Sequence, residues 1–248
     1  MRSRGRAHLI GAGPGDPGLL TLRAITTLAQ ADVIIHDGFL GGEIEKTFPP
    51  GIPVIRVSGP PHGHPTAKVA SLIARHVRRG RTVVRLYVGD PFLFGSGGEE
   101  LEALRRRGIR PEVVPGVTSA TAAGAEYGIP LTHPQCPDGI LILPGRESDV
   151  DWAHAARFRG TLVLMMSVTH LAENCAALLG NGMPLGTPAV IVASGTLPRS
   201  RLVRGTLGTI AAKARRARVK SPAIVVLGDV VRLSTPPPRQ RRNIPRGR

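Results

Sequence analysis

Three glycine-rich loops, each placed directly after an apolar run, hold the residues best suited to binding a ligand. They are GAGPGDPG (residues 11–18), VGDPFLFGSGGEE (88–100) and PGVTSAT (115–121). Glycines let a backbone approach a bound molecule without side-chain obstruction, and a strand, a glycine loop and a helix in succession are typical of anion and nucleotide sites. The first loop departs from G-x-G-x-x-G because Pro14 and Gly15 fill the spacer and proline removes one N–H donor. It therefore matches a dinucleotide site only in part.

Three carboxylates adjoin these loops or the end of an apolar run, and they are the candidate catalytic residues: Asp37, Glu99 and Glu100. Asp37 ends the run ADVIIHD, where it suits a ribose-binding carboxylate and a turn cap equally well. Glu99 and Glu100 suit either work on a substrate or stabilisation of a helix start through its dipole. No metal site is predicted, because the H-G-H at 62–64 lacks a third ligand. A site with few acids and bases suits a reaction whose reagent arrives activated, such as methyl transfer from a sulfonium.

The composition bounds the class of protein. A chain of 248 residues with 42% hydrophobic content is long enough for one large or two small globular domains. No apolar run approaches the roughly 18 residues that a membrane span requires. Cys136 and Cys175 form no CxxC motif and predict free thiols, and the apolar run near the N-terminus is too short for a signal peptide, so a cytoplasmic location is expected.

The formal net charge of +16 is concentrated in part at the two ends of the sequence. Residues 1–6 and 235–248 carry eight arginines and no acidic residue, and their composition predicts disorder. Such ends could contact nucleic acid, but an arginine-rich composition explains them equally well. Aromatic residues make up only 3% of the chain, too few for base-stacking platforms. Nucleic acid is therefore not the expected partner.

Apolar runs that alternate with amphipathic segments predict an α/β fold with a largely parallel, covered sheet. Helical periodicity places Leu22, Ile25 and Ala29 on one face of an early helix and predicts another helix over Lys68–Arg79. Because the carboxyl ends of parallel strands meet at one edge of a sheet, the three glycine loops are expected together at that edge. Open α/β folds bind their ligands there.

Two α/β domains are expected, over residues 7–120 and 121–234. A second set of apolar runs begins near residue 138, and the segment TAAGAEYGIPLTHP between the two sets has the glycines and prolines of a linker.

Six ordered motifs resemble the tetrapyrrole (corrin/porphyrin) methylase family over residues 8–233, nearest to its uroporphyrinogen-III C-methyltransferases. They are GAGPGDPGLLTLRA, VGDPFLFGSGGEE, PGVTSA, GIPLTH, RGTLGTIA and SPAIVVLGDVV. The resemblance implies two α/β domains with S-adenosylmethionine in the cleft between them, and a homodimer. The residues that it assigns to the cofactor are Pro14, Val88, Gly89, Asp90, Leu93, Thr118, Ser119, Met166, Gly195 and Ala223.

The implied chemistry is methyl transfer to carbons C2 and C7 of uroporphyrinogen III, which gives precorrin-2 on the branch to sirohaem and cobalamin, with S-adenosylhomocysteine as the second product. The sequence departs from the family at positions where basic residues are usual: Gly38, Tyr87, Ser96 and Pro134. Arginine is the natural partner of a carboxylate, and uroporphyrinogen carries many carboxylates. A methyltransferase with another acceptor, and a donor-binding protein without catalysis, are therefore the alternatives.

Overall fold

The computed structural model describes residues 5–57, 66–136, 138–146 and 149–234. The H-G-H motif and nearly all of both basic ends lie outside these ranges. Within them, the chain forms two compact units that divide between Thr118 and Ser119, close to the expected boundary at 120/121. Arg6 differs from the expectation of a disordered basic end, because it begins the first strand. No helix among the described residues is long and apolar enough to span a membrane.

The first unit is built on a fully parallel sheet of five strands in the order β3-β2-β4-β1-β5. The strands are β1 Arg6–Gly11, β2 Val33–Asp37, β3 Val54–Val57, β4 Thr82–Tyr87 and β5 Glu112–Val114. β1 lies between β4 and β5, with Ile10 beside Leu86 on one side and beside Val114 on the other. The three strands that precede the glycine loops are therefore neighbours.

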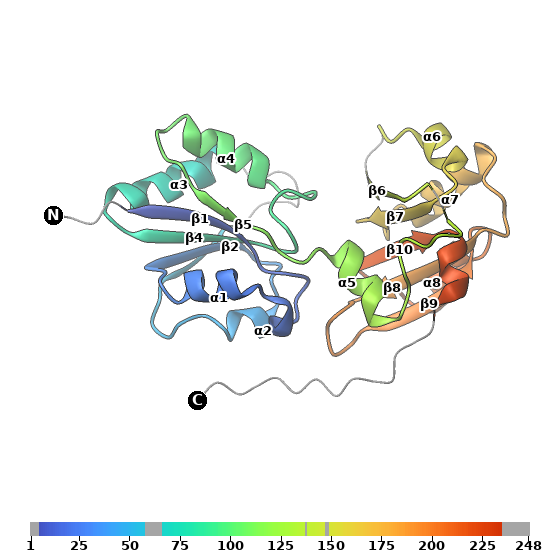
Figure 1. Cartoon of the computed structure of the whole chain (residues 1–248), viewed down its shortest axis with the longest axis horizontal. Coiled ribbons are helices and arrows are strands. Elements are labelled where there is room, and N and C mark those ends of the chain that lie inside the picture. Colours follow the sequence, from blue (N-terminus) through green and yellow to red (C-terminus); the bar gives the residue numbers. More distant parts are fainter. Residues whose placement is uncertain (1–4, 58–65, 137, 147–148, 235–248) are drawn as a thin grey trace. The chain divides into compact units, whose positions relative to one another are not determined.

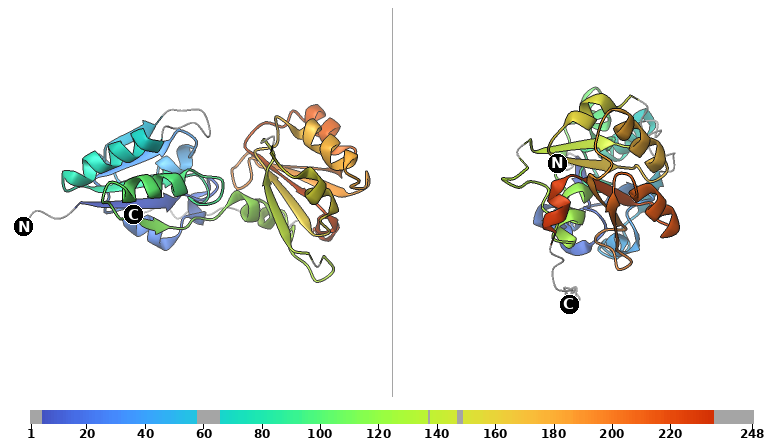
Figure 2. Two further views of the ribbon diagram at one scale, coloured as in Figure 1. Left: turned by 90° about the horizontal axis from the view of Figure 1, so that it is seen from above. Right: turned by 90° about the vertical axis from the view of Figure 1, so that its right-hand side faces the viewer.

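Helices cover both faces of this sheet, as the sequence predicts (Figure 1). The short helix η1 (Pro17–Leu19), α1 (Leu22–Leu28) and α2 (Gly42–Glu45) lie on one face, and α3 (Thr66–Arg78) and α4 (Gly97–Arg105) on the other. α3 and α4 lie side by side, which is clear in the view from above in Figure 2. Each fully buried leucine or isoleucine in the two cores contributes about 1.5–3 kcal/mol.

Helical periodicity is right for α3 and wrong for α1. Ile73 on α3 is fully buried, as expected. On α1, however, Leu22 is 83% exposed and Ile25 is 47% exposed, whereas Ala24 and Leu28 pack on the sheet. The side chain of Thr21 caps this helix by accepting a hydrogen bond from Ala24 N (3.1 Å) and so marks where the helix begins.

The second unit has a mixed sheet in the order β6-β7-β10-β8-β9, in which only β6 and β7 are parallel. The strands are β6 Ile140–Pro144, β7 Thr161–Met165, β8 Pro188–Ala193, β9 Arg201–Thr206 and β10 Ala223–Leu227. The alternation of elements did not predict β9, whose sequence RLVRGT has no long apolar run. This strand forms an antiparallel pair with β8, so the unit is α/β in composition but mostly antiparallel in pairing.

Helices also cover both faces of the second sheet. α6 (Trp152–Arg157), α7 (Leu171–Gly180) and α8 (Ile210–Arg216) pack on one face, and α5 (Ser119–Glu126) and the short helix η2 (Asp229–Leu233) on the other. Both cysteines, Cys136 and Cys175, are buried free thiols in this unit. Burial raises the pKa of Cys175 to about 11, so its thiol stays neutral.

Candidate functional site

The three glycine loops meet at the carboxyl edge of the first sheet, which confirms the expectation from the sequence. Gly13 and Gly89 exchange backbone hydrogen bonds, with N–O distances of 3.2 and 2.8 Å. The Asp90 carboxylate then accepts from Gly116 N at 3.0 Å and from Phe92 N at 2.8 Å. Main-chain bonds and one carboxylate thus tie the loops after β1, β4 and β5 into a single surface.

Several glycines in these loops are required because the three loops pack closely against one another. Their role is therefore not only to let a ligand approach the backbone. A Cβ atom on Gly116 would lie 2.1 Å from the carbonyl oxygen of Gly89, and one on Gly11 would lie 2.5 Å from Gly116 N. Gly13 and Gly89 have φ values of +71° and +70°, which L-residues with side chains rarely adopt. The glycines therefore bring three backbones to a spacing that side chains would prevent.

Most residues assigned to the cofactor by resemblance belong to these loops. Val88 is 44% exposed at the end of β4, whereas Gly89 is buried beneath it. Ser119 is the first residue of α5 in the second unit. The residues in the loops of the first unit are Pro14, Val88, Gly89, Asp90, Leu93 and Thr118.

The remaining three cofactor residues lie together at one edge of the second sheet. Met166 directly follows β7, Gly195 lies just beyond β8, and Ala223 begins β10. Because β10 is antiparallel to both strands, its start lies beside their ends, with Ala223 opposite Ala193 and Ile224 opposite Met165. The structure therefore gathers residues that are far apart in the sequence.

The backbone at this edge is strained. Met166, Ser194 and Thr196 have φ values of 54°, 53° and 67°, and Phe94 in the first unit has 53°. These are four of the five non-glycine residues with positive φ in the described part of the chain. Each such conformation costs about 1–3 kcal/mol and is concentrated at ligand sites in proteins.

Glu126, which the sequence analysis missed, holds the strained segment after β8. Its Oε2 accepts hydrogen bonds from Thr196 N (2.7 Å) and Ser200 Oγ (2.9 Å). The hydroxyl of Tyr127 is 2.9 Å from the same Ser200 Oγ. Seventy residues separate Glu126 from Thr196, so no local pattern in the sequence could have found this contact.

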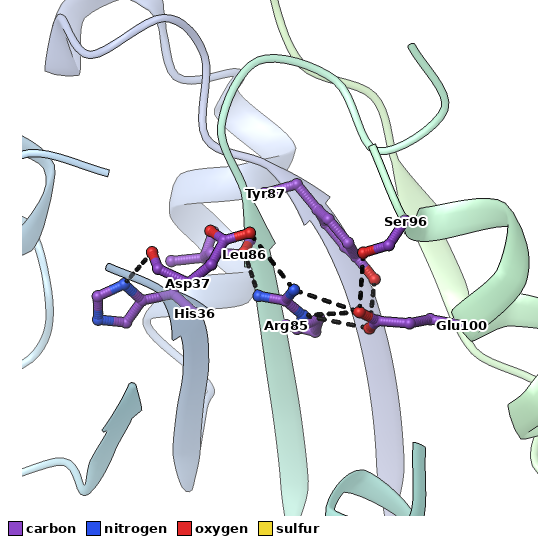
Figure 3. Close-up of polar contacts among 7 residues, drawn as sticks. All are labelled: His36, Asp37, Arg85, Leu86, Tyr87, Ser96 and Glu100. Carbon is purple, nitrogen blue, oxygen red and sulfur yellow. Dashed lines mark hydrogen bonds and ion pairs between the residues drawn. The ribbon is translucent and has the colours of Figure 1, made fainter. Parts of the chain in front are cut away.

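A buried polar cluster lies beneath the first carboxyl edge (Figure 3). Arg85 and Glu100 are fully buried and paired, with Arg85 Nε 3.1 Å from Glu100 Oε2 and Nη2 3.2 Å from Oε1. Tyr87 and Ser96 donate hydroxyl hydrogen bonds to the same carboxylate at 2.7 and 3.0 Å. On the other side, Arg85 Nη2 lies 3.6 Å from Asp37 Oδ2.

Burial and charge shift the pKa values within this cluster. Burial lowers the pKa of Arg85, but Glu100, Tyr87 and Asp37 together outweigh burial, so the pKa is raised. Burial and the Glu100 carboxylate raise the pKa of the Tyr87 phenol well above its ordinary value. Arg85 is therefore a permanent cation and Tyr87 a permanent hydrogen-bond donor.

The three candidate catalytic carboxylates occupy different environments. Glu100 is inaccessible to a substrate in this structure, because it is fully buried and bonded to Arg85, Tyr87 and Ser96. Glu99 is exposed in the first turn of α4, where an acid also favours the helix dipole. The Asp37 side chain is 20% exposed at the end of β2, and no described residue donates a hydrogen bond to its carboxylate.

Two features of the described residues bear on which ligands these edges could hold. No group of three histidine, cysteine, aspartate or glutamate residues lies together in the described ranges. Ser167, which follows Met166, has a buried hydroxyl without a hydrogen-bond partner among the described residues. Because Ser167 is fully buried, this hydroxyl is not accessible to a ligand in this structure.

Solved structures with the same fold are methyltransferases of tetrapyrroles. A cobalt precorrin-4 methyltransferase of cobalamin biosynthesis is 28% identical, with a TM-score of 0.83 over 91% of this chain and 95% of that one. The uroporphyrin-III C-methyl transferase of Thermus thermophilus, in complex with S-adenosylhomocysteine, is 36% identical, with a TM-score of 0.80 over 92% of this chain and 99% of that one.

Sequence comparison agrees with the fold. Residues 6–211 match the profile of the Tetrapyrrole (Corrin/Porphyrin) Methylases. A uroporphyrinogen III methyltransferase of Methanosarcina barkeri, S-adenosylmethionine-dependent by name, is 40% identical over 92% of this chain and 93% of its own length. The siroheme synthase of Gluconobacter oxydans is 40% identical over 93% of this chain, which spans only 50% of that protein. The chain belongs to the tetrapyrrole (corrin/porphyrin) methylase family.

Proposed function

We propose that this protein is an S-adenosylmethionine-dependent C-methyltransferase that methylates uroporphyrinogen III at C2 and C7 to give precorrin-2. The main structural support is that three glycine loops meet at one edge of the first sheet. Hydrogen bonds among Gly13, Gly89, Asp90 and Gly116 hold them together. The names of the Methanosarcina and Thermus relatives support the same donor and acceptor. Because the chain spans half the length of the siroheme synthases, only this methyl transfer is proposed.

In this proposal the donor is held mainly by backbone groups. Val88 and Gly89 contribute from the first unit, and Met166, Gly195 and Ala223 contribute from the second. The donor's sulfonium supplies the methyl carbon: the C–S bond breaks as a bond to the acceptor carbon forms, and the pyrrole N–H loses a proton. The chain's task is to align the two reactants, since alignment alone can lower such a barrier by about 7–11 kcal/mol.

Asp37 is the carboxylate that we assign to the pyrrole N–H. Unlike Glu100 it is partly exposed and accepts no hydrogen bond from any described residue, and unlike Glu99 it is paired with a buried cation, Arg85. An ionised carboxylate with free lone pairs accepts a hydrogen bond and can take up the released proton. Glu99 is the second candidate for this role. Glu100 has a structural role instead, because it is buried and paired with Arg85.

The resemblance also leads us to propose a homodimer, and the two free thiols lead us to propose a cytoplasmic location. The acceptor is proposed to reach basic side chains other than the ones the family usually has at positions 38, 87, 96 and 134. A small-molecule tetrapyrrole is thus the partner, and neither nucleic acid nor membrane is invoked.

Calorimetry with S-adenosylhomocysteine tests the donor part of this proposal. We expect a dissociation constant in the micromolar range or tighter for the unaltered chain. Val88→Trp should weaken binding by about tenfold, which corresponds to about 1.4 kcal/mol. Val54→Trp is the matched control, because Val54 is also about two-fifths exposed (42%) but lies on β3, away from the loops. Equal affinity of both variants, or no heat with the unaltered chain, would contradict the proposed donor site.

A further inference from the structure

One buried guanidinium faces two carboxylates that are held in different ways. Arg85 lies on β4 beside Ile35 of β2, so its side chain is on the same face of the sheet as Asp37, two residues further along. The guanidinium reaches toward the carboxyl edge and lies between Glu100 and Asp37, as Figure 3 shows.

Arg85 is fixed on every other side. Its Nε and Nη2 donate to Glu100, and its Nη1 donates to the carbonyl oxygen of Leu86 at 2.9 Å. The guanidinium carbon lies 4.5 Å from the centre of the Tyr87 ring, in cation–π contact. Tyr87 and Ser96 in turn fix Glu100 through their hydroxyls. The position of the positive charge is therefore set before any ligand binds.

The two carboxylates differ in their remaining hydrogen-bonding capacity. Glu100 is saturated by the guanidinium and two hydroxyls and has no exposed surface. Asp37 has only the 3.6 Å ion pair between its Oδ2 and Arg85, and none of the described residues donates a hydrogen bond to the carboxylate, whose Oδ1 is buried. Electrostatic attraction thus orients the Asp37 carboxylate without consuming its acceptor sites.

We propose that Arg85 is a positioning residue for the methyl transfer, which it serves by holding the Asp37 carboxylate at the edge of the sheet with free lone pairs toward the acceptor's N–H. This inference rests on the proposed function and adds a residue to it. Glu100, Tyr87 and Ser96 act through Arg85, because they form the rigid support of its guanidinium.

A double-mutant cycle tests whether Arg85 acts through Asp37. Arg85→Ala would leave Glu100 buried without its cation and threaten the fold, so the background is R85M/E100M, which removes both charges and keeps apolar volume. Arg85→Lys is the second background, since one ammonium cannot contact both carboxylates as a guanidinium does. Asp37→Asn is then introduced into the unaltered chain and into each background. Thermal unfolding establishes that each variant is folded.

The unaltered chain is assayed with methyl-labelled donor and uroporphyrinogen III without oxygen. We expect Asp37→Asn to lower kcat about 100-fold in the unaltered chain. R85M/E100M alone should lower kcat about tenfold without changing KM for the donor, and Asp37→Asn in that background should cost only about tenfold more, so that kcat is the same as for Asp37→Asn alone. R106M/E102M, which removes an exposed pair 3.6 Å apart at the end of α4, is the matched control and should be neutral.

Three results are decisive. A cost of Asp37→Asn that shrinks in both backgrounds, with donor KM unchanged, is the expected result. An equal cost in every background would show that Arg85 serves only stability and would overturn the inference while the proposed function stands. No methylated product from the unaltered chain would overturn the proposed function, and this inference with it.

Discussion

Asp90 Oδ2 accepts a hydrogen bond from Gly116 N at 3.0 Å, which joins the loop after β4 to the loop after β5. A similar bond exists at the opposite edge of the same sheet, where Asp32 Oδ2 accepts from Thr82 N at 2.7 Å. Asp32 thus joins the neighbouring strands β2 and β4 at their amino ends, whereas Asp90 joins the glycine loops that follow β4 and β5 on either side of β1.

Asp90→Ala should weaken S-adenosylhomocysteine binding by about tenfold, because a hydrogen bond to a charged group is worth about 1.5–3 kcal/mol and the loops lose their link. Asp32→Ala should lower the free energy of unfolding by a similar amount and leave affinity unchanged. Calorimetry and urea unfolding of both variants measure the two effects. Equal losses of affinity would mean that the carboxyl edge is not the donor site.

Gly116→Ala should destabilise the first unit by about 1–3 kcal/mol or more, as overpacking does. The new Cβ would lie 2.1 Å from the oxygen of Gly89 and 2.7 Å from Gly11 Cα, and backbone cannot move aside as a flexible side chain can. Gly98→Ala is the control, since no atom lies within 4 Å and alanine favours the helix by about 0.5–1 kcal/mol. In urea unfolding, the free energy of unfolding should be lower than that of the unaltered chain for Gly116→Ala and higher for Gly98→Ala.

Glu126→Ala should release the segment after β8 and weaken donor binding about tenfold, because Thr196 N and Ser200 Oγ lose their common acceptor. Glu126→Gln, which keeps one amide oxygen, should recover part of the affinity. The KM for S-adenosylmethionine in steady-state kinetics reports the effect. An unchanged KM in a folded Glu126→Ala variant would show that this segment does not contact the donor.

His8 should make stability depend on pH. Burial lowers its pKa below the ordinary value of 6.5, although Glu112 Oε2 lies 3.3 Å from its Nδ1. As the pH falls, the unfolded chain therefore takes up a proton first. The free energy of unfolding should be unaffected by this group above about pH 6.5, and should decrease below that value until the folded state is also protonated.

Urea unfolding between pH 5 and 8 measures this dependence. His8→Gln should make the free energy of unfolding depend less steeply on pH, whereas His154→Gln, at an exposed position on α6, should not. A slope that is the same in His8→Gln as in the unaltered chain would assign the dependence to other groups, such as His76, whose pKa burial also lowers.

The first unit could be predicted from sequence because its signals are local. Strands such as AHLI and TVVRLY are mostly apolar runs, and each glycine loop directly follows one. The parallel sheet, and the gathering of the loops at its carboxyl edge, therefore follow from the order of these segments. The exposed face of α1 was predicted wrongly from periodicity, because Ala24 and Leu28 pack on the sheet and leave Leu22 and Ile25 in solvent.

The features that could not be predicted depend on contacts between residues that lie far apart in the sequence. The antiparallel pairing of β9 with β8 depends on a short, charged strand, RLVRGT, that has no hydrophobic signal of its own. The burial of Glu100 depends on Arg85, fifteen residues away, and the support of Thr196 by Glu126 spans seventy. Motif resemblance gave the positions of the ligand loops but not the residues that hold them in place.

The most direct measurement is anaerobic incubation of the unaltered chain with uroporphyrinogen III and S-adenosylmethionine labelled in the methyl group, followed by mass analysis of the tetrapyrrole. We expect a product that has gained two labelled methyl groups on carbon, with an equal amount of S-adenosylhomocysteine formed. A tetrapyrrole that stays unlabelled while the chain binds S-adenosylhomocysteine would contradict the proposed acceptor.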